Sequence, residues 1–213
     1  MQLSLKGVFP KFFTESQCAQ SGIWGKEVVF NQGNCVLVYG ASGTGKTLLI
    51  HTLYGLFKNL DGIVHSDSYN LSGITLNHLS LLRATHISIV FQDIRLFPDL
   101  TLLENLEIKR LMTNTVSKQE LELWLQRMEL LDKKDKRVSI LSFGEQQKIA
   151  IIRALLQPFE WLLLDEPFAW LDDVQTEAAI HLVTEVVRLN RAGMMITSLK
   201  EDDHFYYTQK MQL

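Results

Sequence analysis

Four short apolar runs along the chain each end at a Gly, Asp or Ser or at a polar side chain, a pattern typical of buried parallel strands. Each run stands beside a stretch with helical periodicity, so we expect a doubly wound α/β sheet. A further strand at 28–30, followed by a turn at 31–34, is expected to add an antiparallel edge. The four predicted parallel strands are Cys35–Tyr39, Ile87–Phe91, Trp161–Leu164 and Met194–Thr197.

The pattern changes from strands to helices between about residues 98 and 140. Ser117 followed by Glu120 predicts a capping box at a helix start. One apolar face then recurs at helical spacing, and it fits either ordinary core packing or docking of a partner. Its members are Leu121, Trp124, Leu125, Met128 and Leu131. We expect 1–213 to form a single domain, with about 98–140 as an inserted helical subdomain.

The composition and charge of the chain limit which classes of function it can have. The 213 residues are 46% hydrophobic and 21% charged, with a net charge of −3, so nothing favours binding to nucleic acid or anionic lipid. Cys35 lies in an apolar run and is expected to be a buried thiol. The N-terminus lacks the pattern of a signal peptide, and no apolar run approaches the roughly 20 residues that span a bilayer. Any work at a membrane would therefore need a partner.

A glycine-rich loop follows the predicted strand Cys35–Tyr39 and precedes a helix expected to begin near Thr47. This context is the one that a phosphate-binding loop requires, because its backbone N–H groups and the helix N-terminus surround the phosphates. The Lys46 ammonium would reach the terminal phosphates, and the Thr47 hydroxyl would bind Mg²⁺. Alone, the loop fits a nucleotide kinase or a GTPase equally well. Its residues are Gly40, Ala41, Ser42, Gly43, Thr44, Gly45, Lys46 and Thr47.

Acidic and amide side chains follow two other predicted strands. Asp165 and Glu166 end the strand that begins at Trp161, at the sheet edge where ligands bind in such folds. We expect Asp165 to hold Mg²⁺ through water and Glu166 to accept a proton from an attacking water. Gln92 follows Phe91, and its neutral amide can contact Mg²⁺ or that water.

A second anion site is predicted upstream of the acidic strand. In Leu141-Ser-Phe-Gly-Glu-Gln-Gln147, Ser142 is expected to be an N-cap, and Gly144 opens a helix that runs through Arg153. A helix start presents free N–H groups. One γ-phosphate has little use for two helix N-termini on opposite sides of a single subunit.

Together these motifs resemble the ATP-binding cassette subunit of ABC transporters, and the match covers about residues 25–198. The resemblance implies that two subunits pack head to tail around ATP, so that Ser142 and Gly144 act in trans, while Leu171 and Asp172 cross the dimer. It implies ATP hydrolysis with Mg²⁺, a second ATPase subunit and an integral membrane permease. The chain would then be cytoplasmic and held at the membrane by the permease.

The segment 91–105 and the short chain look most like the subgroup for lipoprotein release, macrolide efflux and cell division. We expect the permease to dock near Gln92 and the helical insert, where Leu96, Phe97 and Leu100 form either an exposed apolar patch or ordinary core.

The chain departs from the family pattern at four places. Ser198 stands where the family has a His that contacts the γ-phosphate, and His204, six residues later, is expected to be too distant to replace it. Either slow turnover or a nearly inactive site follows, and Ser198 can still donate one hydrogen bond.

The other three departures concern aromatic residues. Phe143 replaces the first of two signature glycines, and Trp170 replaces a small residue. No aromatic residue stands at the usual adenine-stacking spacing, where Gln17 falls. Phe12, Phe13 and Trp24 are only nearby, so the adenine contact stays unassigned.

Two alternatives of other classes remain open. A soluble cassette ATPase acting on DNA, ribosomes or Fe–S assembly usually carries coiled-coil arms, a second cassette or basic surfaces, none of which the sequence shows. A small-molecule kinase would give no role to the segment from Leu141 to Gln147.

Overall fold

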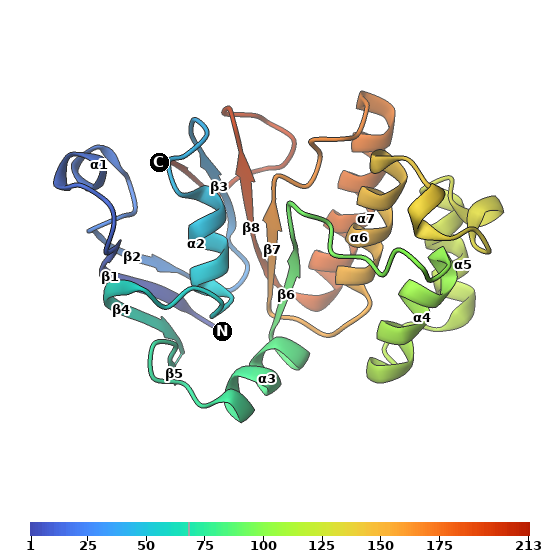
Figure 1. Cartoon of the computed structure of the whole chain (residues 1–213), viewed down its shortest axis with the longest axis horizontal. Helices are drawn as coiled ribbons and strands as arrows, with labels where there is room; N and C mark the ends of the chain where they lie inside the picture. The colour runs from blue at the N-terminus through green and yellow to red at the C-terminus, as the bar shows by residue number, and fades with distance from the viewer. Residues whose placement is uncertain (68) are drawn as a thin grey trace.

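In residues 1–67 and 69–213, which the computed structural model describes, a five-stranded parallel sheet lies at the centre of the fold (Figure 1). Its hydrogen-bonded order is β6-β7-β8-β3-β9, and each neighbouring pair is parallel. The strands are β3 (Cys35–Tyr39), β6 (Ile87–Val90), β7 (Trp161–Asp165), β8 (Gly193–Ser198) and β9 (Gln209–Gln212).

The four apolar runs are confirmed as parallel strands, with small shifts at their ends: β6 ends one residue before Phe91, and β7 and β8 are slightly longer than predicted. Strand β9 was not predicted. Its side chains alternate between half-buried and exposed, and Met211 is its one apolar residue, so the sequence carries no clear strand signal there.

Alternation along β7 divides the interior into two hydrophobic cores. Leu162 and Leu164 point into one core, whereas Trp161 and Leu163 point into the other. All four side chains are fully buried. The central sheet is therefore a layer covered on both faces, which explains why its strands read as continuous apolar runs.

A second sheet is antiparallel, with the order β2-β1-β4-β5. It consists of β1 (Leu3–Pro10), β2 (Glu27–Phe30), β4 (Leu60–Ser66) and β5 (Tyr69–Asn70). The predicted strand at 28–30 is thus an edge of this separate sheet, not of the parallel one. The turn at 31–34 is confirmed, because the Asn34 N–H donates to the Asn31 carbonyl at 2.9 Å.

Strand β1 was missed for a physical reason. Its register against β4 shifts between Lys6 and Phe9, and Gly7 lies at φ +58°, so an irregularity interrupts the alternation. The buried apolar residues fall at Leu3, Leu5 and Val8 instead of at every second position.

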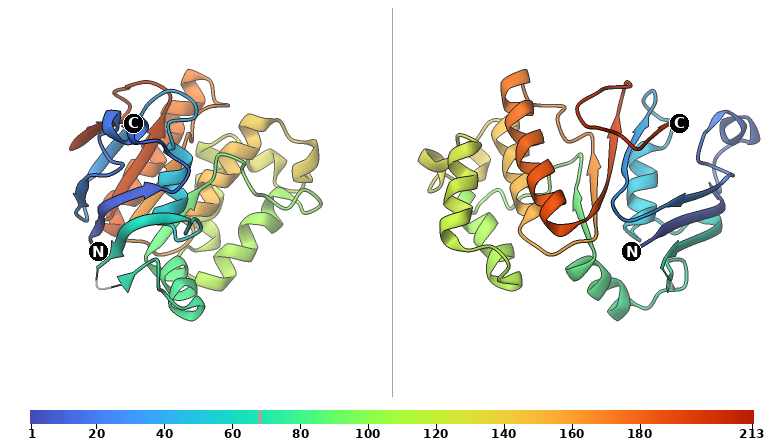
Figure 2. Two further views of the ribbon diagram at one scale, coloured as in Figure 1. Left: turned by 60° about the vertical axis from the view of Figure 1, so that its left-hand side comes forward. Right: turned by 180° about the vertical axis from the view of Figure 1, so that it is seen from behind.

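Helices cover both sides of the central sheet (Figure 2). Helices α2 (Lys46–Leu53) and α3 (Leu76–Thr85) contribute to the core shared with the antiparallel sheet. Helices α6 (Phe143–Leu155) and α7 (Asp173–Asn190) pack into the opposite core. A short helix, α1 (Glu15–Gln20), lies beside the antiparallel sheet.

Between β6 and α6 lie two helices and two short 3₁₀ turns: α4 (Leu102–Thr113), α5 (Lys118–Arg127), η1 (Leu131–Lys133) and η2 (Val138–Ile140). Ser117 caps α5 by accepting the Glu120 N–H at 3.1 Å, which confirms the predicted start. The predicted capping box is incomplete, because the described hydrogen bonds do not include the return bond from the Ser117 N–H to the Glu120 side chain.

The predicted apolar stripe of this segment faces the core. Leu121, Trp124, Leu125 and Met128 are buried. Leu131 lies beyond the helix, in η1, and is half-buried against the same core. The stripe is core packing, and docking of a partner has to use other residues.

Two further sequence expectations concern burial. Cys35 is half-buried and not fully enclosed as predicted, and burial raises the pKa of its thiol to about 12. Among the residues described, no helix combines the length and apolarity required to cross a bilayer.

Candidate nucleotide-binding site

The glycine-rich loop runs from the end of β3 to the start of α2, as predicted. Lys46 is the first residue of α2, and its ammonium is buried inside the loop. It donates to the carbonyls of Gly40 at 2.9 Å and Ala41 at 3.1 Å, and it lies 3.4 Å from the Glu166 carboxylate. A buried cation is therefore held at the mouth of a turn of backbone N–H groups, where a phosphate would pair with it.

Gly45 lets two aromatic residues approach this loop. It lies at φ +97°, and a Cβ there would come within 2.9 Å of the Trp24 indole nitrogen and 3.0 Å of the Phe13 ring. The loop is thus backed by side chains from the segment between β1 and β2.

The end of β7 carries the two carboxylates. Asp165 is fully buried, and its Oδ1 accepts the Thr197 hydroxyl at 2.8 Å. The same Thr197 oxygen accepts the backbone N–H of Glu166 at 2.9 Å. Burial raises the pKa of Asp165, while the hydrogen bond from Thr197 opposes the increase. One hydroxyl therefore fixes the positions of both acidic residues.

Thr197 was not singled out from the sequence. It stands one residue before Ser198 on β8, directly opposite Asp165 in the parallel register. The pattern predicted both strands but not that they are neighbours, so this contact had no sequence signal.

Thr47 and Gln92 contact each other in a recess that Asp165 also lines. The Thr47 hydroxyl donates to Gln92 Oε1 at 3.1 Å. His51, one turn beyond Thr47 on α2, lines the same recess with Gln92, Asp165 and Glu166. Burial lowers the pKa of His51. Its spacing of four residues from Thr47 is the signal that could have revealed it.

This group of oxygen ligands fits a hard cation. Asp165 Oδ2 is buried and has no hydrogen-bond partner among the residues described. Together with the Thr47 hydroxyl and the Gln92 amide it offers three neutral or anionic oxygens, the type of ligand that Mg²⁺ prefers.

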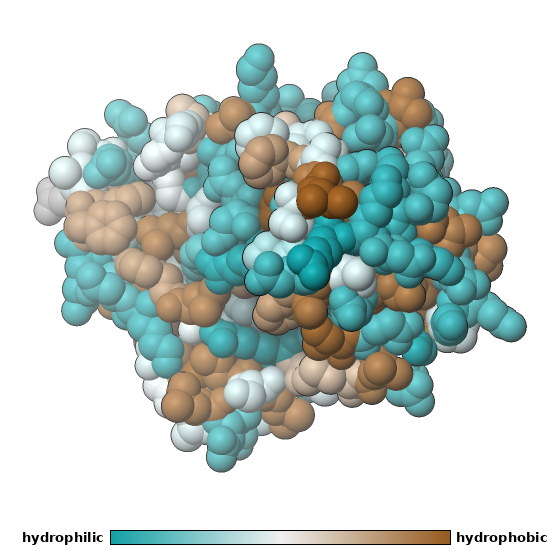
Figure 3. Space-filling view, turned by 45° about the vertical axis from the view of Figure 1, so that its right-hand side comes forward, coloured by the Kyte–Doolittle hydropathy of each residue, from teal (hydrophilic) through white to brown (hydrophobic). Residues whose placement is uncertain are grey.

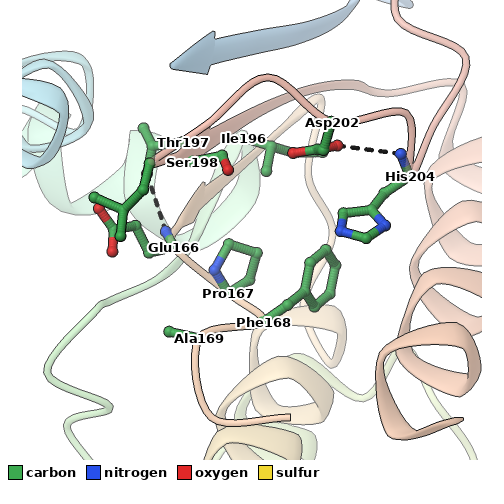
Figure 4. A pocket seen from close by; sticks show the side chains of 10 residues that line it. Glu166, Pro167, Phe168, Ala169, Ile196, Thr197, Ser198, Asp202 and His204 are labelled. Carbon is green, nitrogen blue, oxygen red and sulfur yellow. Dashed lines mark hydrogen bonds between the residues drawn. The ribbon is translucent and has the colours of Figure 1, made fainter. Parts of the chain in front are cut away.

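Ser198 and Glu166 line one cavity of about 210 Å³ (Figure 4). The Ser198 carbonyl accepts the Gly40 N–H at 3.2 Å, which ties β8 to the phosphate loop. His204 lines the same cavity, because the segment after β8 folds back without disturbing the strand register. Its ring packs edge-on against Phe168 at 5.7 Å and lies apart from the Glu166 carboxylate.

The second predicted anion site lies elsewhere. Ser142 caps α6, accepting the Glu145 N–H at 3.2 Å, and its own N–H donates to Glu145 Oε2 at 2.7 Å. Asp172 caps α7 by accepting the Gln175 N–H at 2.8 Å. Strands β7 and β8 lie between α6 and α2 (Figure 1), and neither Ser142 nor Gly144 lines the recesses beside the phosphate loop.

Two of the departures from the family pattern contact each other. The rings of Phe143 and Trp170 stack with centroids 5.3 Å apart and planes at 29°, although both side chains remain more than half exposed. A Cβ on Gly144 would come within 2.8 Å of the Trp170 carbonyl. The start of α6 and the segment after Glu166 are therefore packed directly together.

Gln17, which stands at the usual adenine-stacking spacing, contributes to the cap of α1 instead. Gln17 Oε1 accepts the Thr14 N–H at 2.9 Å and completes the cap of α1. Phe12 and Phe13 instead line the recess beside the phosphate loop, and Phe12 is 61% exposed. Trp24 is buried and offers no free face.

Comparisons with known proteins agree with this geometry. The family model described as ABC transporter matches residues 26–169. An uncharacterized ABC transporter ATP-binding protein of Mycobacterium tuberculosis is 32% identical over 78% of this chain, which spans about half of that relative's length (51%). The lipoprotein-releasing system ATP-binding protein LolD of Bacteroides fragilis is 31% identical over 84% of this chain and 83% of its own length.

Among solved structures, the dimeric post-hydrolysis structure of the ATP-binding cassette MJ0796 bound to ADP and Pi is similar, with a TM-score of 0.78. It is 25% identical, covering 93% of this chain and 88% of the other. The family match includes the phosphate loop, the start of α6 and the acidic strand end in one continuous segment. The chain belongs to the ABC transporter family of ATP-binding cassettes.

Proposed function

We propose that this chain is the ATP-hydrolysing subunit of an ABC transporter, and that two subunits closing around ATP drive a membrane permease. The observation that carries the proposal is the convergence of Lys46, Thr47, Gln92, Asp165 and Glu166 at one edge of the parallel sheet. The backbone from Gly40 to Thr47 would bind the phosphates, with Lys46 exchanging its carbonyl partners for phosphate oxygens.

Magnesium would be held by Thr47, Asp165 and Gln92, and would neutralise charge on the phosphates. Glu166 would act as the general base, taking a proton from the attacking water. The Glu166 backbone lies at φ +46°, which is unfavourable for any residue other than glycine. The Thr197 hydroxyl accepts the Glu166 N–H and holds it in place. Ser198 would donate a hydrogen bond from the same cavity.

A second subunit is needed because Ser142, Gly144 and Asp172 do not line the phosphate recess of their own chain. Ser142 and Asp172 are exposed at the starts of α6 and α7. We propose that they meet the nucleotide of an identical partner. The dimer reported for MJ0796 supports this arrangement.

We place adenine recognition at Phe12. Its exposed ring lies in the recess that also contains Gly43, Gly45 and Lys46, and base stacking requires such a free aromatic face. Phe13 and Phe57 hold the ring through edge contacts at 5.3 and 6.1 Å.

The permease would bind near Gln92 and the segment 98–140, which we propose to be the helical subdomain. Phe97 is 52% exposed there, whereas Leu96 and Leu100 are half-buried, so the apolar patch expected from sequence reduces to Phe97. The relationship to LolD supports a lipoprotein-release or exporter type, with the chain on the cytoplasmic face of the membrane.

Replacing Glu166 by Gln tests the shared nucleotide site. The variant should bind Mg-ATP, accumulate as a closed dimer in size-exclusion chromatography with light scattering, and release phosphate at least about a hundredfold more slowly. Glu177→Gln, at an exposed position on α7, is the matched control. Wild-type turnover by Glu166→Gln would show that Glu166 is not the base. Monomers of both proteins in saturating Mg-ATP, even beside the membrane component, would contradict the shared site.

A further inference from the structure

A cavity of about 430 Å³ lies between α1, the end of β1 and the segment that precedes β2. Its size is within the range of sites for small organic molecules, which are likewise mainly apolar and aromatic. The cavity shares only Phe13 with the recess beside the phosphate loop, and no residue with the recess that Asp165 lines. It is therefore distinct from the site where the nucleotide would bind.

The inner wall of this cavity also backs the phosphate loop. Phe13 and the buried Trp24 form the wall and pack edge-on, with ring centroids 6.0 Å apart. A Cβ on Gly45 would come within 3.0 Å of both rings, although Gly45 itself does not line the cavity. In the described residues the Trp24 indole N–H has no acceptor, so no hydrogen bond of that side chain fixes the wall. Packing alone holds it, and an occupant of the cavity would add to that packing.

Two side chains give the cavity its polar character. They are the Cys18 thiol and the Lys26 ammonium, because the backbone N–H groups of Gly25 and Lys26 already donate to carbonyls of the fold. Lys26 is exposed and makes no ion pair among the residues that the structure describes. The adjacent acid, Glu27, pairs with Lys6 at 3.2 Å. One cation at the edge of an apolar cavity is thus available to a ligand.

This lining favours a small, flat molecule with one negative charge. Phe9, which is 36% exposed, and Phe13 offer aromatic surfaces from two different segments. A carboxylate at the open edge would pair with Lys26. At the end of the molecule that carries the antiparallel sheet, on the left of Figure 3, apolar side chains (brown) are interspersed with polar ones (teal). This surface offers a protein partner no broad apolar patch.

We propose that the cavity is an effector site for a small planar aromatic carboxylate, whose binding tightens Mg-ATP binding by fixing the wall behind Gly45. The ring would pack between Phe9 and Phe13, and the carboxylate would pair with Lys26. Each ligand then orders the same wall, so the second ligand to bind loses less entropy. By linkage, each must tighten the binding of the other by the same factor.

The test of the site uses the full chain and 2-naphthoate as the probe, with binding measured by isothermal titration calorimetry. Ala19→Trp fills the cavity, whereas Gln20→Trp places the same ring on the next residue of α1, which does not line it. Both positions are exposed, and ATP binding verifies the fold of each variant. We expect Ala19→Trp to abolish probe binding, Lys26→Glu to weaken it at least about tenfold, and Gln20→Trp to leave it unchanged.

The thiol in the cavity reports where the probe binds. Saturating 2-naphthoate should slow alkylation of Cys18 by iodoacetamide at least about fivefold and leave Cys35 unaffected, as measured by peptide mass spectrometry. Phe12→Ala removes the ring that we assign to adenine. If Phe12→Ala abolishes probe binding and Ala19→Trp does not, the probe occupies the nucleotide recess and the proposed site is wrong.

Coupling is measured as the Mg-ATP affinity of the wild type with and without saturating 2-naphthoate. We expect the affinity to rise about fivefold in the wild type and to stay constant in Ala19→Trp. An unchanged affinity in the wild type would overturn the effector role, and failure of the wild type to bind 2-naphthoate would overturn the site itself. Both measurements use the isolated chain, so loss of the proposed transporter role would produce neither result.

Discussion

At the residue scale, the Thr197 hydroxyl is the connection on which the acidic strand end depends. It donates to Asp165 and accepts from the Glu166 backbone, so the two carboxylates are held by one side chain from the neighbouring strand. Ser198, the next residue on β8, reaches the same cavity as Glu166 but is shorter than a histidine. We propose that Ser198 stands at the position where the family pattern has a histidine, and a hydroxyl there cannot carry charge near neutral pH.

Ser198→His should raise the steady-state ATPase rate about tenfold or more, because an imidazole reaches farther across the cavity toward Glu166. Phosphate release by purified protein measures this, and Ser198→Ala is the matched control. An unchanged rate in Ser198→His would show that this position does not limit hydrolysis.

At the scale of elements, the start of α6 and the segment after Glu166 are joined by the stack of Phe143 on Trp170 and by the close approach at Gly144. Each aromatic residue alone departs from the family pattern. The two departures are coupled, because the Phe143 ring packs on the Trp170 ring where the family pattern would give it a small neighbour.

A double-mutant cycle tests this pairing. Phe143→Ala and Trp170→Ala should each destabilise the fold, and their effects should be non-additive by about 0.5–1 kcal/mol, the range for an exposed aromatic pair. Urea unfolding followed by circular dichroism measures the free energies. Ile140→Ala, another exposed apolar residue nearby in sequence, should combine additively with Trp170→Ala. Additive effects at 143 and 170 would show that the stack contributes no stability.

Strand ends could be predicted from sequence because an apolar run must stop where a parallel strand leaves the core, and Asp165, Glu166 and Gln92 stand at those stops. Contacts between segments that are distant along the chain could not be predicted from the sequence. The position of Thr197 beside Asp165 depends on strand order, and the approach of His204 to Ser198 depends on how the segment after β8 folds back. Strand β1 was not predicted because Gly7 interrupts the alternation of buried and exposed positions.

At the scale of the whole molecule, the buried Asp165 makes stability depend on pH. An ordinary Asp carboxyl ionises near pH 4, but burial raises the pKa of Asp165 in the folded chain. As pH rises between these two values, the unfolded chain loses the proton first. The free energy of unfolding therefore falls through this window and stays lower above it.

Replacing Asp165 by Asn removes the cost of burying a charged carboxylate. Without nucleotide, the variant should melt at a higher temperature than the wild type at pH 7, and the difference should shrink as the pH falls toward 4. Differential scanning calorimetry across this range measures both, with the exposed substitution Asp99→Asn as control. A variant that is no more stable than wild type at pH 7 would contradict the assigned cost of burying this charge.

The packing of Trp24 against Gly45 has a practical consequence. Indole emission responds to nearby charge, and this indole lies directly behind the loop that would hold a triphosphate. Its N–H has no acceptor in the described residues, and its ring packs edge-on against Phe13 at 6.0 Å. We expect Trp24, one of four tryptophans in the chain, to change its emission when nucleotide enters this loop, which would let loading and release be followed without any attached dye.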